Sequence, residues 1–380
     1  MEMFLVCTEA SGDLLGARLI HELKKKQPNL VIRGVGGEKL LEEGMCPSYR
    51  VSDFNVMGLI EVLSQLKRLK SIFNELVEEV ISSQPQVVVL IDAPDFNLRF
   101  AKALKKRQKD ISIIYYVSPQ VWAWREKRAG EIARVVDHMM VLFSFEKEIY
   151  ARYQLPTTWV GHPLVDELHL AGDTELFKRQ HGLALDRPLV ALAPGSRKSE
   201  VRRLLPVMAE VARARADQYQ FVIPLANTIP IEEAQALLGD VSVPILPGMM
   251  RPIMFHADAA VVASGTATLE TGLLRTPMVV GYKMKAGSYL LARMLVKVAH
   301  VALVNIVLGE RVVPELIQKE FCPEKILPEL DALVTPGPRR TKVLEAFEQL
   351  EPILGGGGAA SRAAAVVARF LVPTEQRGRE

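Results

Sequence analysis

Short runs of apolar residues recur along the chain, and each run is followed by small or polar residues and then by a helical pattern of hydrophobic positions. Runs that are apolar almost throughout and are separated by helices are typical of parallel sheets buried on both faces. The runs form two series. The first comprises Met3–Cys7, Leu30–Gly34, Val87–Ile91, Ile113–Val117, Met139–Leu142 and Thr158–Val160, and the second comprises Leu189–Leu192, Phe221–Pro224, Val243–Leu246, Ala259–Ala263 and Met278–Gly281.

Two such series predict an α/β protein with two doubly wound, Rossmann-like domains. The pattern is interrupted over residues 161–187, where a Gly-Asp pair and a charged stretch replace it. We therefore expect an N-terminal domain over residues 1–170 and a second domain over 171–350. The remaining residues, 351–380, contain four consecutive glycines and then an Ala/Val-rich helical pattern. This segment is expected to be a hinge and a helix that could pack back on the first domain.

Composition and charge exclude several classes of protein. The chain has 380 residues, 49% hydrophobic and 24% charged, which is ordinary globular composition. The 47 Lys and Arg against 44 Asp and Glu give a net charge of +3, so there is no general reason to expect nucleic-acid binding. The three cysteines are far apart and form no metal-ligand spacing. With no signal-peptide core, and with two basic residues in the most apolar window, 289–308, we expect a cytosolic chain without a membrane span.

Ligands of open parallel sheets bind at the carboxyl ends of the strands, so the residues that follow each strand are the candidates. The run T-E-A-S-G-D after the first strand lacks G-x-G-x-x-G, and its Asp13 suits a helix N-cap as well as a role in acceptor binding. Asp92 and Asp95 follow the run at 87–91. Because Pro94 disfavours helical geometry in the residue before it, Asp92 belongs to the strand end, where a general base would stand. Asp95 suits a turn or a helix cap better.

Aromatic and histidine residues follow two later strands of the first series. Trp122 and Trp124 stand in the run S-P-Q-V-W-A-W, which could hold a sugar ring or an acyl chain or could pack in the core. His162 follows the last strand and could reach a site between the domains. A lone histidine is more often structural, so this position carries both interpretations.

The second domain has two junctions that suit a phosphate. P-G-S-R at 194–197 and S-G-T-A-T-L-E at 264–270 each place small residues where a helix begins, and Arg197 adds a forked donor. Neither is a Walker loop. Together they indicate a diphosphate site, whose Glu270 could bind ribose hydroxyls or could simply be an acid favoured in a first helical turn.

A basic, amphipathic stretch suggests a membrane surface. Between Glu270 and Glu310 there is no acidic residue, and in residues 290–298 the apolar positions fall on one helical face and Arg293 and Lys297 on another. A second basic cluster lies at 99–109, and an apolar patch at 56–63. Each of these features also fits an ordinary core-packed helix with solvated charges.

These motifs occur together in the order seen in the lipid-A-disaccharide synthase family, which the chain resembles to about Glu320. The D-A-P-D-F-N and S-P-x-V-W-A-W motifs are highly specific. Gln120 stands where the family often has Ser, and Val304 replaces the Pro that usually precedes Asn305. The segments that carry the resemblance are Ser11–Asp13, Val56–Gly58, Ile91–Asn97, Tyr116–Trp124, Pro194–Arg197 and Ala263–Glu270.

The resemblance implies a GT-B fold and a cytosolic enzyme that works at the inner face of the inner membrane as an intertwined homodimer. It implies an inverting transfer from UDP-2,3-diacylglucosamine to the 6-hydroxyl of 2,3-diacylglucosamine 1-phosphate (lipid X), without metal or other cofactor. On this basis we expect catalytic roles for Asp92, Glu9 and His162, acceptor or acyl-chain contacts from Ser11, Asp13, Met57, Trp122 and Trp124, and UDP contacts from Ser196, Arg197, Ser264, Gly265, Thr266, Ala267, Glu270 and Asn305.

Two other functions fit the same fold. A UDP-sugar 2-epimerase would need additional carboxylates in the cleft between the two domains, and it would need no apolar surface. It would convert the UDP-sugar donor without an acceptor. A non-catalytic nucleotide-sugar sensor would show no turnover.

Overall fold

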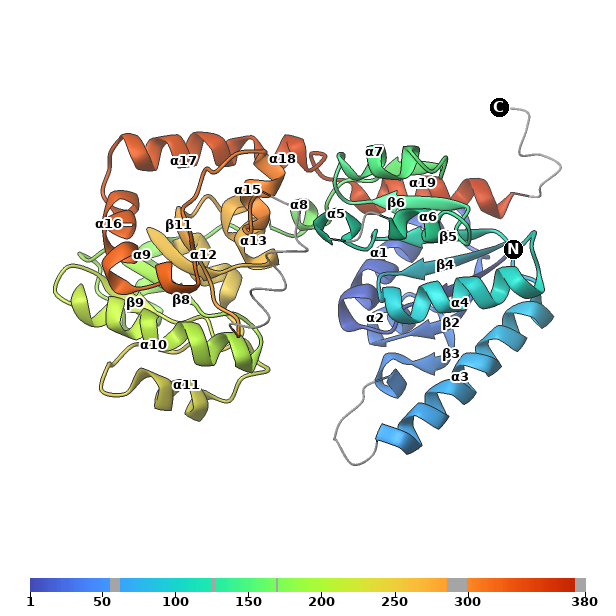
Figure 1. Ribbon diagram of the computed structural model, residues 1–380, viewed down its shortest axis with the longest axis horizontal. Coiled ribbons are helices and arrows are strands. Elements are labelled where there is room, and N and C mark those ends of the chain that lie inside the picture. Colours follow the sequence, from blue (N-terminus) through green and yellow to red (C-terminus); the bar gives the residue numbers. More distant parts are fainter. Residues whose placement is uncertain (55–61, 125–126, 169, 286–298, 373–380) are drawn as a thin grey trace. The chain divides into compact units, whose positions relative to one another are not determined.

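The structure is a computed structural model that describes residues 1–54, 62–124, 127–168, 170–285 and 299–372 (Figure 1). The chain divides into two compact units: unit 1 comprises Met1–Pro163 with Gly357–Glu380, and unit 2 comprises Leu164–Gly356. Each unit is built on one parallel sheet, which confirms the predicted α/β class with two doubly wound domains.

The sheet of unit 1 has seven strands in the order β3-β2-β1-β4-β5-β6-β7, and every neighbouring pair is parallel. The central strand is β4, all of whose residues are buried. Ile91, its last residue, pairs with Tyr116, the last residue of β5, so the two strands end side by side. The strands are β1 (Glu2–Val6), β2 (Val31–Gly36), β3 (Cys46–Arg50), β4 (Val87–Ile91), β5 (Ile113–Tyr116), β6 (His138–Val141) and β7 (Thr157–Trp159).

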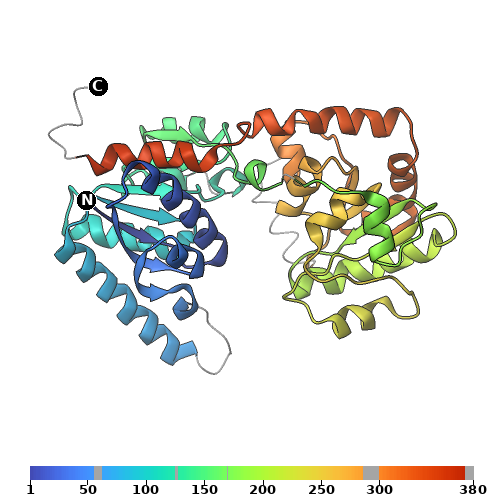
Figure 2. The same cartoon turned by 180° about the vertical axis from the view of Figure 1, so that it is seen from behind.

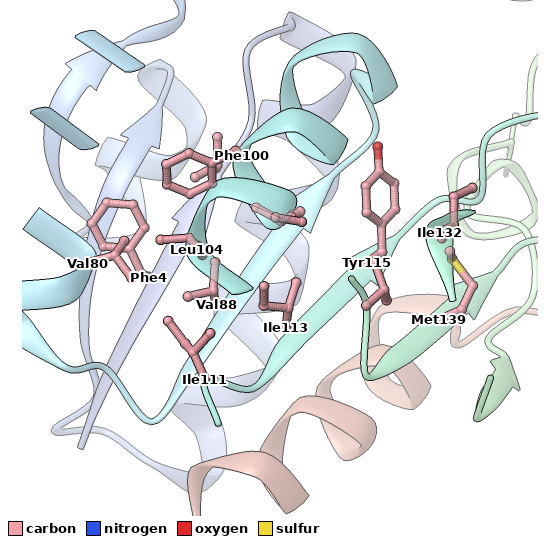
Figure 3. Close-up of a cluster of buried hydrophobic side chains, with 14 of the residues drawn as sticks. Phe4, Val80, Val88, Phe100, Leu104, Ile111, Ile113, Tyr115, Ile132 and Met139 are labelled. Atoms are coloured by element: carbon pink, nitrogen blue, oxygen red, sulfur yellow. The ribbon is translucent and has the colours of Figure 1, made fainter. Parts of the chain in front are cut away.

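Helices cover both faces of this sheet. Alternate residues of β1 and β4, such as Phe4 and Val88, form a buried cluster with Phe100 and Leu104 of α4 and with α3 (Figure 3). The C-terminal helix α19 packs on α1 and β4 (Figures 1 and 2). The helices of unit 1 are α1 (Ala10–Lys26), α2 (Glu38–Glu42), α3 (Val62–Ser83), α4 (Pro94–Arg107), α5 (Val121–Trp124), α6 (Arg128–Ile132), α7 (Glu146–Ala151) and α19 (Ala359–Leu371), with a 3₁₀ turn η1 (Val51–Phe54).

The sheet of unit 2 has five parallel strands in the order β12-β11-β10-β8-β9. Its strands are β8 (Leu189–Ala193), β9 (Gln220–Val222), β10 (Ala259–Ala263), β11 (Met278–Tyr282) and β12 (Glu315–Ile317). Its helices are α8 (Leu164–Glu167), α9 (Thr174–Gln180), α10 (Lys198–Ala214), α11 (Ile231–Leu238), α12 (Met250–His256), α13 (Thr266–Leu273), α15 (Leu303–Leu308), α16 (Pro323–Val334), α17 (Pro338–Glu348) and α18 (Leu350–Ile353), with a 3₁₀ turn η2 (Gln318–Glu320).

Two features of the sheets differ from the sequence prediction. The run at 243–246 is not a strand, because Pro244 offers no N–H and the segment makes only an isolated bridge from Ile245 to Ile223. Strands β3 and β12 were not predicted. Both lie at sheet edges, and β3 alternates exposed and half-buried residues instead of being apolar throughout.

Within the described residues, no helix has the length and the apolar character needed to cross a membrane.

Candidate active site

Asp92 stands at the carboxyl end of the central strand of unit 1, in a strained turn. Its φ is 49° and that of Ala93 is 43°, so two consecutive residues with side chains adopt the left-handed conformation, at a cost of about 1–3 kcal/mol each. The side-chain amide of Asn97, which is fully buried, donates to the carbonyl oxygens of Ile91 at 3.0 Å and of Asp92 at 2.8 Å. The hydroxyl of Tyr115 also donates to the Asp92 carbonyl. These contacts hold the turn and thereby the direction in which Asp92 leaves the sheet.

The surroundings of Asp92 make it a stronger base than an exposed aspartate. Burial raises the pKa of its carboxyl, and the negative charge of Glu9 raises the pKa further, against a hydrogen bond from the Ala93 N–H that lowers it. Glu9 is exposed and immediately precedes α1. Because β1 and β4 are paired neighbours, the residues after both strands meet at one edge of the sheet. A carboxylate of raised pKa at such an edge suits proton removal from a hydroxyl.

Asp95 differs from Asp92 in its environment. Its side chain is 92% exposed, and its carboxylate lies 3.5 Å from the guanidinium of Arg128. The site residue Ser11 is also exposed, in the first turn of α1.

Asp13 is a structural residue in unit 1, which changes the prediction made for it. Helix α1 begins at Ala10, so Asp13 lies inside its first turn and is not its N-cap. The buried carboxylate instead accepts the N–H groups of Gly37 at 2.7 Å, Lys39 at 3.0 Å and Leu40 at 3.1 Å, and so caps α2. These bonds give the carboxylate a structural role within the fold, and the acceptor contact implied by the resemblance remains a prediction.

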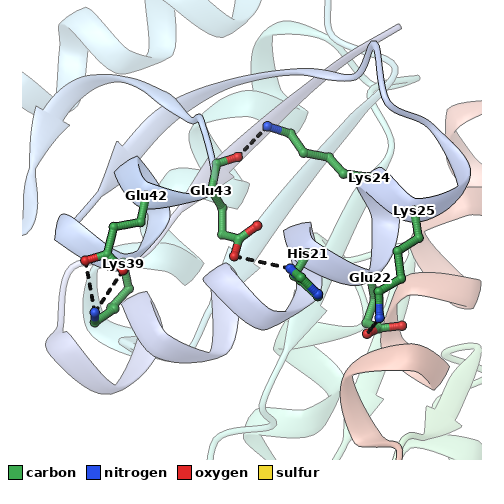
Figure 4. Close-up of polar contacts among 7 residues, drawn as sticks. All are labelled: His21, Glu22, Lys24, Lys25, Lys39, Glu42 and Glu43. Atoms are coloured by element: carbon green, nitrogen blue, oxygen red, sulfur yellow. Dashed lines mark hydrogen bonds and ion pairs between the residues drawn. The ribbon is translucent and has the colours of Figure 1, made fainter.

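Helix α2 is also tied to α1 from its other end. Lys24 donates to the carbonyl of Glu43, and His21 lies 3.3 Å from the Glu43 carboxylate (Figure 4). On the surface of this region Lys39 pairs with Glu42, and Lys25 with Glu22. Polar contacts with α1 therefore hold α2 at both of its ends.

We call Ser118–Trp122 the tryptophan segment. It begins after Val117, whose φ of 73° is left-handed, an outlier for a β-branched residue. Ser118 is buried, and the indole of Trp122 packs edge-to-face on Phe145, with ring centroids 5.5 Å apart. The segment therefore joins the core on one side. The side chain of Trp124 and all of Met57 lie outside the described residues.

His162 follows β7 and is buried, with its ring 5.3 Å from the ring of Phe143. This packing is consistent with the structural interpretation of the residue, and it leaves the catalytic role implied by the resemblance as a prediction.

In unit 2 the junction between β10 and α13 leaves space beside its backbone. Gly265 has φ 146° and ψ −161°, and apart from its chain neighbours no atom of the described residues lies within 4 Å of where a side-chain carbon would be. Thr266 is exposed and Ala267 is half-buried, at the start of the helix, where N–H groups have no intrahelical acceptor. The hydroxyl of Ser264 donates to the Val301 carbonyl at 2.8 Å. The backbone of this turn, more than the Ser264 hydroxyl, is arranged for an anion.

The junction between β8 and α10 carries the basic residue. The Arg197 side chain is 79% exposed and lies 3.0 Å from the Glu200 carboxylate, three residues along the chain. Ser196 is exposed, and its carbonyl accepts the hydroxyl of Thr228 at 2.8 Å. An anionic ligand must therefore compete with Glu200 for the guanidinium, a contact that the sequence did not suggest.

Glu270 and Asn305 are both engaged inside unit 2. The guanidinium of Arg251 lies 3.2 Å from the Glu270 carboxylate and 2.7 Å from that of Glu167. If Glu270 binds the ribose hydroxyls, it does so while it is paired with Arg251.

The amide of Asn305 is fully buried. It donates to the Val313 carbonyl and the Glu315 carboxylate and accepts the N–H groups of residues 312 and 313, at 2.8–3.0 Å. Two donors and two acceptor positions are all that an amide offers. This geometry argues against a direct side-chain contact from Asn305 to the nucleotide.

Within the described ranges, no group of three or more His, Cys, Asp and Glu side chains is placed to hold a metal ion.

Sequence reasoning missed the residues that support the site. Tyr115 lies within the predicted strand run Ile113–Val117 and Arg251 in a run with no distinctive pattern, and the contacts of both come from the fold. Asn97 lies within the D-A-P-D-F-N motif, so its place in a specific motif was the available signal.

Solved structures share this fold at low sequence identity. The UDP-GlcNAc 2-epimerase of Neisseria meningitidis bound to UDP-GlcNAc superposes with a TM-score of 0.65 and 14% identity, covering 98% of this chain and 99% of that one. The calicheamicin glycosyltransferase gives a TM-score of 0.60 and 14% identity over 97% and 98% of the two chains. The fold is therefore that of GT-B glycosyltransferases and UDP-GlcNAc 2-epimerases.

Sequence relatives are much closer. Lipid-A-disaccharide synthases of Myxococcus xanthus and Syntrophus aciditrophicus are 40% and 42% identical, over 98% and 97% of both chains respectively. A family model described as lipid-A-disaccharide synthetase matches residues 3–353. With the family model and these relatives in agreement over nearly the whole chain, the protein belongs to the lipid-A-disaccharide synthetase family.

Proposed function

We propose that the protein condenses UDP-2,3-diacylglucosamine with 2,3-diacylglucosamine 1-phosphate to form the β-1,6-linked lipid A disaccharide 1-phosphate and UDP. The observation that carries this proposal is the family match over residues 3–353. The geometry of unit 1 adds support, because Asp92, in the specific motif of the family, ends the central strand in a strained and well-supported turn.

In this reaction Asp92 is the general base. It removes the proton from the 6-hydroxyl of the acceptor as that oxygen attacks the anomeric carbon from the face opposite UDP, so the configuration inverts. Burial and, after it, the negative charge of Glu9 raise the pKa of Asp92 and keep it basic. The bond from the anomeric carbon to the β-phosphate oxygen breaks, and UDP leaves with the electron pair.

The leaving diphosphate needs positive charge, and unit 2 supplies it. Arg197 and the N-terminus of α13, with Gly265, Thr266 and Ala267, are the groups we assign to it. Ser196, Ser264 and Glu270 complete the proposed nucleotide contacts. No step in this scheme uses a metal ion.

We assign binding of the lipid acceptor to Ser11 and the tryptophan segment, with Met57 and Trp124 as further apolar contacts.

We also propose that the protein associates with anionic membranes through the basic stretch at 290–298 and the patch at 56–63, which lie largely outside the described residues. Both substrates are lipids, which supports this. Vesicle flotation at low and high salt tests it, since electrostatic binding must weaken with salt. The homodimer and the location at the inner membrane remain predictions.

The reaction is tested by incubating the protein with donor, acceptor or both, and measuring UDP release and disaccharide. We expect product only when both substrates are present. Conversion of the donor alone would support an epimerase, and no turnover would support a sensor.

Asp92→Asn tests the base. The variant keeps the shape of the side chain and removes its basicity, so turnover at saturating substrate should fall roughly 10²- to 10⁴-fold while UDP binding and the melting temperature are kept. Asp95, exposed in the first turn of α4, provides the matched control, and Asp95→Asn should stay near wild type. A near-normal rate in Asp92→Asn, with a loss in Asp95→Asn or His162→Ala, would move the assignment to that residue.

A further inference from the structure

Arg251 lies between two carboxylates in unit 2. It is the second residue of α12, and its guanidinium contacts Glu167, the last residue of α8, and Glu270 of α13. Its Nη2 donates to Oε2 of Glu167 at 2.7 Å, and its Nε donates to Oε2 of Glu270 at 3.2 Å. One positive charge therefore joins two negative charges that stand 84 and 19 residues away along the chain. The mechanism above gives Arg251 no role.

Only one oxygen of the Glu270 carboxylate is engaged by this contact. Arg251 holds Oε2, and among the described residues Oε1 accepts no hydrogen bond. The Glu270 side chain is also 19% exposed, whereas that of Glu167 is 9% exposed. An ionised carboxylate has about four acceptor positions over its two oxygens. Glu270 can therefore accept a hydrogen bond from a ligand while the guanidinium holds its other oxygen.

The Glu270 carboxylate stands one helical turn beyond the backbone assigned to the diphosphate. Thr266 is the first residue of α13, and Glu270 follows four residues later. Residues at this spacing are neighbours on one face of a helix, about 6 Å apart along its axis. In a nucleoside diphosphate the ribose is joined directly to the α-phosphate. A diphosphate at the start of α13 would therefore bring the ribose hydroxyls within reach of Glu270.

The contact with Arg251 prepares Glu270 for such a ligand. A flexible glutamate that becomes ordered on binding lowers the affinity by roughly two- to tenfold, and a side chain that is already held avoids this loss. The planar fork of the guanidinium fixes both carboxylates at once, which the single ammonium of a lysine would not do. The Arg251 side chain is 36% exposed, and ion pairs of such exposed groups contribute little to folding. Stability alone is therefore a weak reason for this arrangement.

We infer that Arg251 is a positioning residue for nucleotide recognition, which holds the Glu270 carboxylate in the orientation that binds the ribose hydroxyls and so makes the site selective for a ribonucleotide. This inference rests on the proposed function, which assigns the ribose to Glu270. Arg251 acts through Glu270, without touching the nucleotide itself, and Glu167 is the second anchor of its guanidinium.

Calorimetry with UDP and its 2′-deoxy and 3′-deoxy forms tests the inference, because each deoxy form lacks a single hydroxyl. Wild type should bind UDP about tenfold or more tightly than at least one deoxy form, since the missing hydroxyl donates to a charged acceptor. Arg251→Lys keeps the positive charge between the carboxylates and loses the fork. Its preference for UDP over that deoxy form should fall to about threefold or less, with the affinity for the deoxy form within twofold of wild type.

Arg213→Lys is the matched control. Arg213 lies in α10 of the same unit and makes an exposed ion pair with Asp240. This variant should keep the affinities of wild type for all three ligands. A lost preference in Arg251→Lys, beside a wild-type preference in Arg213→Lys, supports the inference.

Glu270→Gln tests the same contact from the other side. It should lose the preference for UDP, and the double variant with Arg251→Lys should lose no more than Glu270→Gln alone, because Arg251 acts through Glu270. A wild-type preference in Arg251→Lys overturns the inference, even if all three affinities fall together, since a residue that only stabilises the fold weakens every ligand alike. If the melting curve shows that Arg251→Lys does not fold, an unchanged preference in Glu270→Gln overturns it.

The inference can fail separately from the proposed function, because calorimetry needs no turnover. A wild-type protein that makes no disaccharide from donor and acceptor would remove the proposed function. Equal affinities of the wild type for UDP and both deoxy forms would remove the ribose contact of Glu270, and the positioning role of Arg251 with it, whatever the disaccharide assay shows.

Discussion

The ionisation of Glu146 should make unit 1 less stable as the pH rises. Glu146 is buried, and burial raises its pKa in the folded protein to about 7 from an ordinary value of 4.5. Between these values the folded state keeps the proton that the unfolded state has lost, so the free energy of unfolding falls as the pH rises. The difference, 7 − 4.5, is about 2.5 pH units, and at 1.36 kcal/mol for each unit the full loss is about 3 kcal/mol. Most of this loss, roughly 2–3 kcal/mol, falls between pH 5 and pH 8.

The perturbation is Glu146→Gln, which removes the titrating group and keeps its size. All three tryptophans, Trp122, Trp124 and Trp159, belong to unit 1, so intrinsic fluorescence follows the unfolding of this unit in urea. Other groups titrate in both proteins and cancel in the difference. The free energy of unfolding of the variant minus that of wild type should therefore increase by roughly 2–3 kcal/mol from pH 5 to pH 8.

A difference that stays constant across this range would refute the reasoning, because it would mean that Glu146 has an ordinary pKa in the folded protein. A difference that decreases would mean that the charged form is favoured by the fold. The expected outcome is a variant that is more stable than the wild type at pH 8.

Two further predictions concern unit 2. Arg197→Ala should weaken UDP binding about tenfold or more, and Glu200→Gln should strengthen it severalfold by releasing the guanidinium; calorimetry measures both, and unchanged affinities would exclude Arg197 from the diphosphate site. Asn305→Ala should lower the free energy of unfolding of unit 2 by about 2–4 kcal/mol, because a buried amide with four hydrogen bonds is lost. Denaturation followed by circular dichroism measures this effect, and a loss of UDP affinity at full stability would restore the direct nucleotide contact.

The apolar runs predicted the sheets well because a parallel strand buried on both faces needs an apolar side chain at nearly every position. Strand β4 is such a strand, and it is buried throughout. Strand β3, at the sheet edge, has no such apolar run. The apolar run at 243–246 led to a wrong strand prediction, because Pro244 lacks the N–H group that a strand residue donates. Local pattern therefore predicts central strands better than edges.

The sequence predicted those candidate site residues that directly follow a strand. Asp92 could be placed from Pro94 and the strand before it, but the left-handed turn and the support from Tyr115 depend on contacts between distant residues. Asp13 looked like a cap of its own helix because its partner, α2, lies 24 to 27 residues further along the chain. Glu146 resembles any surface glutamate in the sequence, and only the fold shows that it is buried.

The return of the chain to unit 1 has a consequence for synthesis. Helix α19 packs on α1 and β4, and its buried residues include Ala363, Val367 and Leu371. Unit 2 is nevertheless made before it, since the chain leaves unit 1 after Pro163. At about 5–20 residues per second, a ribosome needs roughly 10 to 40 s to pass from residue 163 to residue 371. Throughout that interval the surface of α1 that receives α19 is uncovered. The first domain to be translated is thus the last to be completed, and its folding is coupled to elongation through the whole of the second.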